Sequence, residues 1–259
     1  KINDNNNDRK SIDREITQEA LEMVQNGSAL STDAATIVYN PTWNKGVVGI
    51  VASRLVEAFY KPTIVLTKSN GFITGSARSV AGFDLYEAIE SCADLIENFG
   101  GHVYAAGLTL KEGNLEEFVG RIDKFIAGKI TEEMLTPMTD IDAKLEFSQI
   151  TPKFFRLLKQ FQPFGPGNTN PVFLTENVSD GGNGRKVGAG GVHMKLDLID
   201  EKQPFHQIPA IAFNMAEFYD YIKAGNPFDI CYSIVENYYR GNTTLQLRIK
   251  DIKERDEFI

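Results

Sequence analysis

The stretch at residues 100–107 combines glycine with a side chain that can donate a hydrogen bond to an anion. It reads Gly-Gly-His-Val-Tyr-Ala-Ala-Gly. Two adjacent glycines let the backbone approach a ligand closely or turn with positive φ, and a histidine beside them supplies a donor. We therefore predict that Gly100, Gly101 and His102 contact a phosphate. The alternative is that His102 only satisfies a backbone carbonyl beside the turn.

A second donor-rich stretch lies at residues 75–79, which read Gly-Ser-Ala-Arg-Ser. It places Ser76, Arg78 and Ser79 at the end of a predicted strand. Arginine suits bidentate binding of phosphate oxygens, so these three residues are candidate phosphate ligands. The alternative is a surface arginine that pairs with a nearby carboxylate.

A third stretch, Trp-Asn-Lys-Gly-Val-Val-Gly-Ile-Val-Ala at residues 43–52, places Gly46 at the start of a predicted helix. The free N–H groups and the dipole of a helix N-terminus favour an anion. Gly46 is therefore a candidate donor to phosphate, and the alternative is a plain turn with Gly46 as the N-cap.

Basic residues in the second half of the chain point to a different kind of contact. Arg185 and Lys186 lie in a glycine-rich loop at 181–191, Lys195 follows it, and Arg240 sits at a probable hairpin turn beside two tyrosines. Cationic loops with aromatic neighbours are typical of single-strand binding. The alternatives are a disordered turn and ordinary strand tyrosines. Further upstream, we interpret Phe161 and Phe164 as core anchors of a turn.

Hydrophobic periodicity indicates which elements position these residues. The first half has a βαββαβα order, in which an acidic N-cap at Asp84 opens a helix that runs to Gly100. This order favours an α/β domain with helices packed against a sheet. In the second half, short strands alternate with glycine-rich turns, which favours a small, mostly-β barrel. The expected segments are a connector in 1–29, whose helix spans 8–26 and stops at Gly27, an α/β domain at 30–129, a linker at 130–138 and a barrel at 139–259. The barrel is expected to begin with a strand at 141–147.

Composition limits the possible functions. The 259 residues carry a net charge of −8, and acidic residues outnumber basic ones in 1–29, in 30–129 and in 130–259. An indiscriminate duplex binder is therefore not expected, and a nucleic-acid site must be a local basic patch. Two distant cysteines and no clustered ligands indicate neither a disulfide framework nor a metal site, and a cytoplasmic location is the default. No apolar run is long enough for a membrane span. The polar start without Met suggests a fragment of a longer protein.

Four motifs together resemble the RecJ family within the DHH phosphoesterase superfamily. They are Trp-x-x-Gly-Val-Val-Gly-Ile-Val-Ala-Ser-Arg-Leu at 43–55, Gly-Ser-Ala-Arg-Ser at 75–79, Gly-Gly-His-x-x-Ala-Ala-Gly at 100–107, and Pro-Phe-Gly-Pro-Gly-Asn-x-Asn-Pro-Val-Phe at 163–173. The resemblance implies a DHH-associated substrate-binding domain followed by an oligonucleotide-binding (OB) barrel. Asn44 departs from the pattern, because many relatives have His after the Trp.

The resemblance also implies a function. Family members are 5′→3′ exonucleases for single-stranded DNA in repair and recombination, and a separate DHH domain binds two Mn²⁺ or Mg²⁺ ions. Arg78 and Ser79 would then bind phosphate, and His102 would support catalysis. No metal-binding cluster is evident in this sequence, so we expect this chain to bind DNA without cleaving it and to bind no metal. Expected partners are single-stranded DNA, the DHH domain, and a helicase or single-strand-binding protein. The alternatives are a phosphodiesterase for short RNA or cyclic dinucleotides, and a non-catalytic module that binds single strands or docks a partner.

Overall fold

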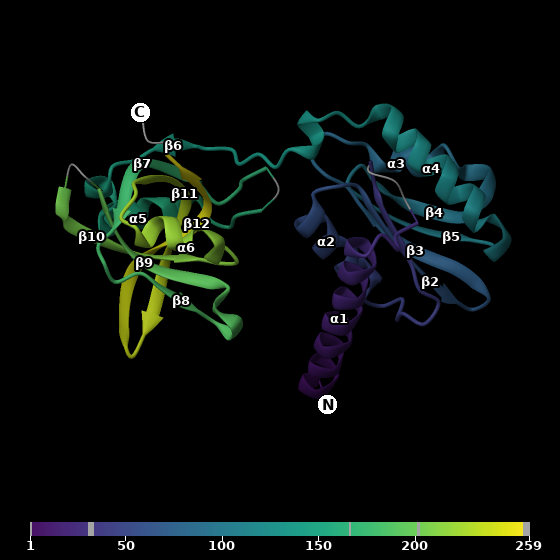
Figure 1. The fold of residues 1–259 in the computed structure, drawn as a ribbon, viewed down its shortest axis with the longest axis horizontal. Helices are drawn as coiled ribbons and strands as arrows, with labels where there is room; N and C mark the ends of the chain where they lie inside the picture. Colours follow the sequence, from purple (N-terminus) through teal and green to yellow (C-terminus); the bar gives the residue numbers. More distant parts are fainter. Residues whose placement is uncertain (1, 31–33, 166, 201–202, 256–259) are drawn as a thin grey trace. The chain divides into compact units, whose positions relative to one another are not determined.

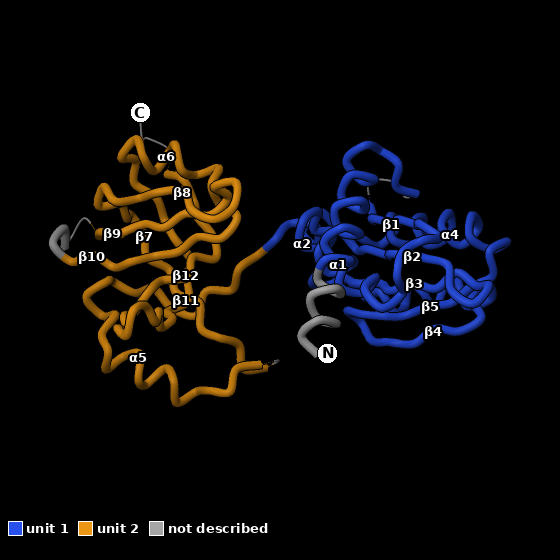
Figure 2. The backbone as a smooth tube through the Cα atoms, turned by 90° about the horizontal axis from the view of Figure 1, so that it is seen from below, with its two compact units in different colours: residues 1–137 blue, residues 138–259 orange. Residues whose placement is uncertain are grey.

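The chain folds into two compact units, residues 1–137 and 138–259, each with its own hydrophobic core (Figure 2). The computed structural model describes residues 2–30, 34–165, 167–200 and 203–255. Among the residues described, none of the helices combines the length and the apolarity that a bilayer-spanning helix requires.

Unit 1 is built on a five-stranded sheet with strand order β1-β2-β3-β5-β4. β1 runs parallel to β2, and the other neighbours are antiparallel. The strands are β1 (Thr36–Tyr39), β2 (Thr63–Ser69), β3 (Phe72–Arg78), β4 (Ile96–His102) and β5 (Ala105–Leu110).

Helices cover both faces of this sheet (Figure 1). In β2, Ile64 and Leu66 face the core under α3 and α4, whereas Val65 faces the core under α1 and α2. A strand covered on both faces tends to carry consecutive apolar residues rather than an alternation, which explains Ile64, Val65 and Leu66 in a row in β2. The helices are α1 (Ile2–Gln25), α2 (Val48–Phe59), α3 (Leu85–Glu90) and α4 (Leu115–Lys129), with the 3-10 turns η1 (Ala93–Leu95), η2 (Glu112–Asn114) and η3 (Glu133–Leu135).

The prediction of one helix from Asp84 to Gly100 is wrong. Asp84 does cap α3, because its Oδ1 accepts from the Glu87 N–H at 3.0 Å, but α3 ends at Glu90. The following residues turn through η1 into β4, which pairs with β5 along most of its length. Glycine is a poor helix former, and the hairpin satisfies the backbone of both strands, so tertiary pairing overrides the helical period.

The predicted connector helix is longer than expected and begins at Ile2 rather than near residue 8. It ends as predicted, because Gly27 follows it with φ +69°. Two polar contacts fix α1 on the unit. The indole Nε1 of Trp43 donates to Glu19 Oε2 at 2.7 Å, and Arg54 Nη2 on α2 pairs with the buried Asp13 at 2.7 Å.

Unit 2 is mostly β. Pairings β7–β11, β11–β12, β12–β10, β10–β9 and β9–β7 run around a ring of five strands. The β7–β9 pairing involves only three residue pairs, so the ring closes at one end of these strands. The strands are β6 (Ala143–Lys144), β7 (Phe173–Asp180), β8 (Arg185–Val187), β9 (His193–Asp200), β10 (Gln203–Ala212), β11 (Phe228–Tyr239) and β12 (Asn242–Glu254).

The connectivity of this ring is that of an OB fold: the first three strands pair in sequence, the third runs parallel to the fifth, and a helix precedes the fourth. The prediction of an α/β domain followed by a mostly-β OB domain is confirmed. Two details differ, because the strand expected at 141–147 contains only the two residues of β6, and 185–187 form β8 inside the glycine-rich loop. The helical elements are α5 (Pro152–Leu158), α6 (Tyr219–Lys223), η4 (Phe147–Gln149), η5 (Lys159–Phe161), η6 (Ala189–Gly191) and η7 (Ala216–Phe218).

Candidate nucleic-acid interface

Strand pairing in unit 1 brings two of the predicted motifs onto one face of the sheet. Arg78 on β3 lies opposite Ala105 on β5, which lies opposite His102 on β4. Two residues away, Ser76, Gly107 and Gly100 form a parallel row by the same pairings. Side chains alternate across a strand, so both rows share a face. The small residues within these rows leave the backbone in the middle of the face uncovered by large side chains.

Arg78 is held in place at the edge of this face. Its Nη1 donates to Ser76 Oγ at 2.9 Å and to the Ala77 carbonyl at 2.7 Å. Within the described part of the chain no carboxylate pairs with it. The alternative of a carboxylate-paired surface arginine therefore receives no support, and the half-buried guanidinium keeps donors for an external anion.

The first turn of α2 lies against this arginine. A Cβ placed on Gly49 would be 3.1 Å from Arg78 Nη2 and 3.2 Å from Ser76 Oγ, so glycine lets the helix approach both groups closely. The N-cap of α2 is Val47, and among the residues described no side chain caps this end of the helix. An uncapped N-terminus beside an arginine is a favourable environment for phosphate.

Gly46 lies in the turn before α2. Its N–H donates to Asn44 Oδ1 at 2.8 Å, and the N-cap position belongs to Val47. In this arrangement the glycine whose missing side chain makes room for Arg78 and Ser76 is Gly49 rather than Gly46. The Gly-Val-Val-Gly spacing contained the signal, because the second glycine falls in the first helical turn.

Ser79 and His102 support the same edge differently. The Ser79 hydroxyl donates to the Phe83 carbonyl at 2.8 Å, and its N–H donates to the Tyr104 carbonyl at 3.0 Å, so Ser79 fastens two loops together. His102 is exposed, and its Nδ1 accepts from the Tyr104 N–H at 3.3 Å. That contact leaves Nε2 as the protonated nitrogen of the neutral ring, which can donate outward.

In unit 2, pairing aligns three cations across four strands. Arg185 on β8, Lys195 on β9, Ile211 on β10 and Arg248 on β12 are successive cross-strand neighbours. The three charged side chains are exposed, whereas Ile211 is buried. We call Arg185, Lys195 and Arg248 the cation row. It crosses the strands that bind oligonucleotides in OB folds.

An aromatic pair flanks the cation row. Phe213, a residue that is 43% exposed, lies 5.2 Å from the guanidinium of Arg248 and meets the His193 ring edge-on at 5.2 Å. His193 Nδ1 accepts from the Asn214 N–H at 3.0 Å, and its ring fills the space that a Cβ on Gly188 would need. The rings are thus held in position, as a stacking surface requires.

The other two predicted contacts of unit 2 lie outside the cation row. Lys186 pairs across to Met194 and places its ammonium 5.0 Å from the Tyr219 ring. Arg240 forms the turn of the β11–β12 hairpin, 5.2 Å from the ring of Tyr239, which is 64% exposed. Sequence reasoning missed Arg248, Phe213 and His193, since only the register of β9, β10 and β12 brings them together.

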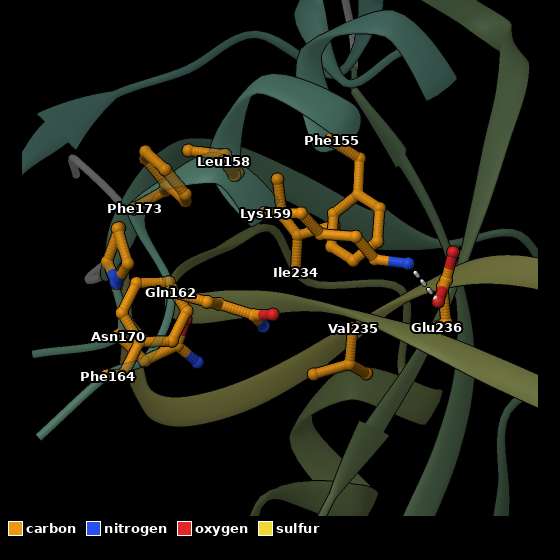
Figure 3. Close-up of a pocket in the computed structure, with 11 residues that line it drawn as sticks. Phe155, Leu158, Lys159, Gln162, Phe164, Asn170, Phe173, Ile234, Val235 and Glu236 are labelled. Atoms are coloured by element: carbon orange, nitrogen blue, oxygen red, sulfur yellow. Dashed lines mark hydrogen bonds and ion pairs between the residues drawn. The ribbon is translucent and has the colours of Figure 1, made fainter.

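The motif at 163–173 surrounds a separate cavity of about 240 Å³ in unit 2 (Figure 3). Phe164 and Phe173 of the motif line it together with Phe155. Phe161 is 63% exposed, so the interpretation of Phe161 as a core anchor is wrong, and Phe164 is half-buried without belonging to the core cluster of unit 2.

No metal site accompanies these surfaces in the ranges that the structure describes, where no group of three or more His, Cys, Asp or Glu side chains is placed to hold an ion. The arrangement can bind phosphates and stack bases, but it contains no set of ligands for metal-assisted hydrolysis.

Comparison with known proteins gives two family matches. Residues 32–128 match the DHHA1 domain, and residues 141–251 match the RecJ OB domain. The chain is 35% identical over 250 residues to the single-stranded-DNA-specific exonuclease RecJ of Bacillus subtilis, covering 95% of this chain and 31% of that protein. It is 31% identical over 261 residues to the RecJ of Haemophilus influenzae, covering 97% and 44%. The chain thus spans less than half the length of these relatives.

Solved structures agree on the fold. Crystal structures of RecJ from Thermus thermophilus in complex with Mg²⁺ and with Mn²⁺ superpose with TM-scores of 0.74 and 0.75. They share 23% and 24% sequence identity with this chain, and the superposition includes 97% of it. It includes 36% and 35% of the length of the two RecJ chains.

Proposed function

We propose that this chain is the DNA-holding part of a single-stranded-DNA exonuclease, because it belongs to the RecJ family through a DHHA1 domain followed by a RecJ OB domain. The whole protein would hydrolyse DNA in the 5′→3′ direction during repair and recombination, in the cytoplasm. One observation carries the assignment for this chain. Arg78 is half-buried, has no carboxylate partner among the residues that the structure describes, and lies against the N-terminus of α2, which none of those residues caps.

In unit 1 the proposed ligand is a backbone phosphate. Arg78 would bind its oxygens, Ser76 would orient the guanidinium, and the α2 terminus near Gly49 would add its dipole. His102 would donate from Nε2 to the same or the adjacent phosphate. Because Gly100 and Gly107 have no side chains, a sugar-phosphate chain would be able to approach the sheet closely at these positions.

In unit 2 the cation row would follow the strand's phosphates, and Phe213 would stack on a base. Arg240 and Lys186 would contribute from the two loops beside it. These local cations explain how a chain of net charge −8 could still bind DNA.

Divalent metal, Mn²⁺ or Mg²⁺, would activate water in the whole enzyme. The described residues do not offer a ligand set that fits it, so we assign the metal to no residue of this chain. We therefore expect this chain with Mn²⁺ to leave a labelled oligonucleotide intact in a gel assay. Release of mononucleotides by the purified chain would contradict this division of labour.

Binding is best tested by fluorescence anisotropy of a 5′-phosphorylated single strand of about 12 nucleotides across salt concentrations. We expect Arg78→Ala and the pair Lys195→Ala with Arg248→Ala each to weaken binding about 10-fold, and to reduce the salt slope by roughly one for each phosphate that is no longer neutralised. Arg121→Ala and Lys144→Ala are matched controls, since both residues are exposed and paired with carboxylates.

The same titration separates the rival functions. Competition by single-stranded DNA but not by a cyclic dinucleotide or a short RNA supports the exonuclease assignment. Preferred binding of the small nucleotides would favour the related phosphodiesterase. No binding of any nucleotide by folded protein at low salt would favour a module that docks a partner protein.

A further inference from the structure

Residues of the motif at 163–173 line a cavity that belongs to neither of the two proposed phosphate-binding surfaces. Asn168 fastens the loop, because its Nδ2 donates to the carbonyls of Phe161 at 2.8 Å and Pro163 at 3.0 Å. The loop is thereby held against α5 and β11, where it encloses about 240 Å³ (Figure 3).

The lining of this cavity combines flat aromatic walls with free amides. Phe155, Phe164 and Phe173 supply the rings, and the Gln162 side chain points into the space (Figure 3). Asn170 also lines it, and within the described ranges neither amide group has a hydrogen-bond partner. Both residues are exposed, so each amide can offer a donor and an acceptor to a ligand that enters from solvent.

Rings and amides together match one ligand chemistry. Nucleobases stack on aromatic side chains, and their edges present adjacent donors and acceptors that Asn and Gln amides complement. We propose, resting on the single-strand binding proposed above, that this cavity holds one unstacked base of the DNA, with Gln162 and Asn170 bonded to its edge.

The opposite end of the cavity fits a polynucleotide rather than a free base. Lys159 pairs with Glu236 at 2.5 Å and lies 5.1 Å from the Phe155 ring. All three residues also line a second cavity of about 670 Å³, which adds the cation Arg156. A strand with one base in the first cavity would therefore continue past the Lys159–Glu236 pair to Arg156, whose guanidinium would bind its phosphate.

The test compares two single strands of about 12 nucleotides, one with bases and one with abasic tetrahydrofuran units on the same 5′-phosphorylated backbone. We expect the pair Gln162→Leu with Asn170→Leu to weaken binding of the base-containing strand about 10-fold, since two hydrogen bonds are removed, and to leave the abasic strand unaffected. Val235→Phe, which fills the cavity without touching the amides, should produce the same selective loss.

Gln160→Leu is the matched control, because this exposed glutamine is two residues from Gln162 and lines neither cavity. Urea midpoints equal to wild type establish that each variant is folded. Unchanged affinity in both pocket variants, while Arg78→Ala still weakens binding, would overturn the base pocket and leave the proposed function standing. An equal loss on both strands would likewise overturn it. If the wild-type chain binds neither strand, the proposed function fails together with this inference.

Discussion

At the residue scale, the two glycines of the Gly-Gly-His motif have different roles. A Cβ on Gly101 would lie 2.2 Å from the Ala105 carbonyl oxygen and 2.5 Å from the Ala106 Cα, both of them backbone atoms of the paired strand. A Cβ on Gly100 would have no atom of the described residues within 4 Å. Gly101 therefore allows the hairpin to close, and Gly100 keeps the open face clear.

This difference predicts opposite outcomes for one substitution. Gly101→Ala should lower the free energy of unfolding by about 3 kcal/mol, because backbone atoms cannot move aside as a side chain can. Gly100→Ala should change it by less than about 0.5 kcal/mol. Urea titrations followed by Trp43 fluorescence measure both, and equal destabilisation by the two variants would show that the steric argument is wrong.

Tyr232 is the most strongly perturbed titrating group among the described residues. It is fully buried, and its hydroxyl lies 2.8 Å from Thr175 Oγ1, which itself donates to the Leu145 carbonyl. Burial raises the pKa of Tyr232 to about 12, and the hydrogen bond with Thr175 only partly offsets this. The folded chain therefore keeps this proton at a pH where the unfolded chain has lost it.

The sign of the pH dependence follows. Stability from this pKa difference is complete below about pH 10 and is lost as pH rises toward 12, by about 2 to 3 kcal/mol in all. Tyr232→Phe should cost about 1 kcal/mol near pH 8, where it only removes a hydrogen bond. Near pH 11 that deficit should shrink or reverse. Urea unfolding of both proteins at the two pH values tests this, and a constant difference would refute the linkage.

At the element scale, α1 is fastened to the segment that leads into the phosphate-binding helix. Trp43 is buried, and its indole N–H reaches Glu19 on α1, while its carbonyl accepts from Thr67 Oγ1 at 2.7 Å. The same segment continues through Gly46 into α2. The position of α1 and that of the helix end beside Arg78 are therefore linked through one side chain.

Substitution of Glu19 tests this link. Glu19→Leu should lower the free energy of unfolding by about 1 kcal/mol, because a buried indole N–H loses its acceptor, and should shift Trp43 emission to the red. Glu19→Gln should behave like wild type, since the amide oxygen still accepts. Trp43 is the single tryptophan of the chain, so its emission reports this contact directly. An equal effect of both variants would implicate charge rather than the hydrogen bond.

At the scale of the whole molecule, each hydrophobic core of the described residues lies within one unit, and each unit has its own sheet. We expect two unfolding transitions in calorimetry, of which only that of unit 1 coincides with the Trp43 fluorescence transition. Gly101→Ala should lower the midpoint temperature of the unit 1 transition alone, and Tyr232→Phe should lower that of the unit 2 transition alone. A single transition that moves in both variants would show that the units unfold cooperatively.

Features with a local cause could be predicted from the amino-acid sequence alone. The Asp84 cap, the end of α1 at Gly27 and the alternation of the long strands depend on neighbouring residues, so reading along the chain identified them. The glycine and donor composition of the motifs was equally readable, and it indicated Arg78 and His102 as candidate donors.

Features that depend on pairing between distant segments required the tertiary structure. Pairing made residues 96–102 a strand rather than the end of a helix, because the β5 backbone offered hydrogen bonds that a glycine-containing helix end could not match. It placed Arg78 in line with His102, and it gathered Arg185, Lys195 and Arg248 beside Phe213. The register between paired strands, some of them tens of residues apart in the sequence, sets these neighbours. A local periodicity does not predict that register.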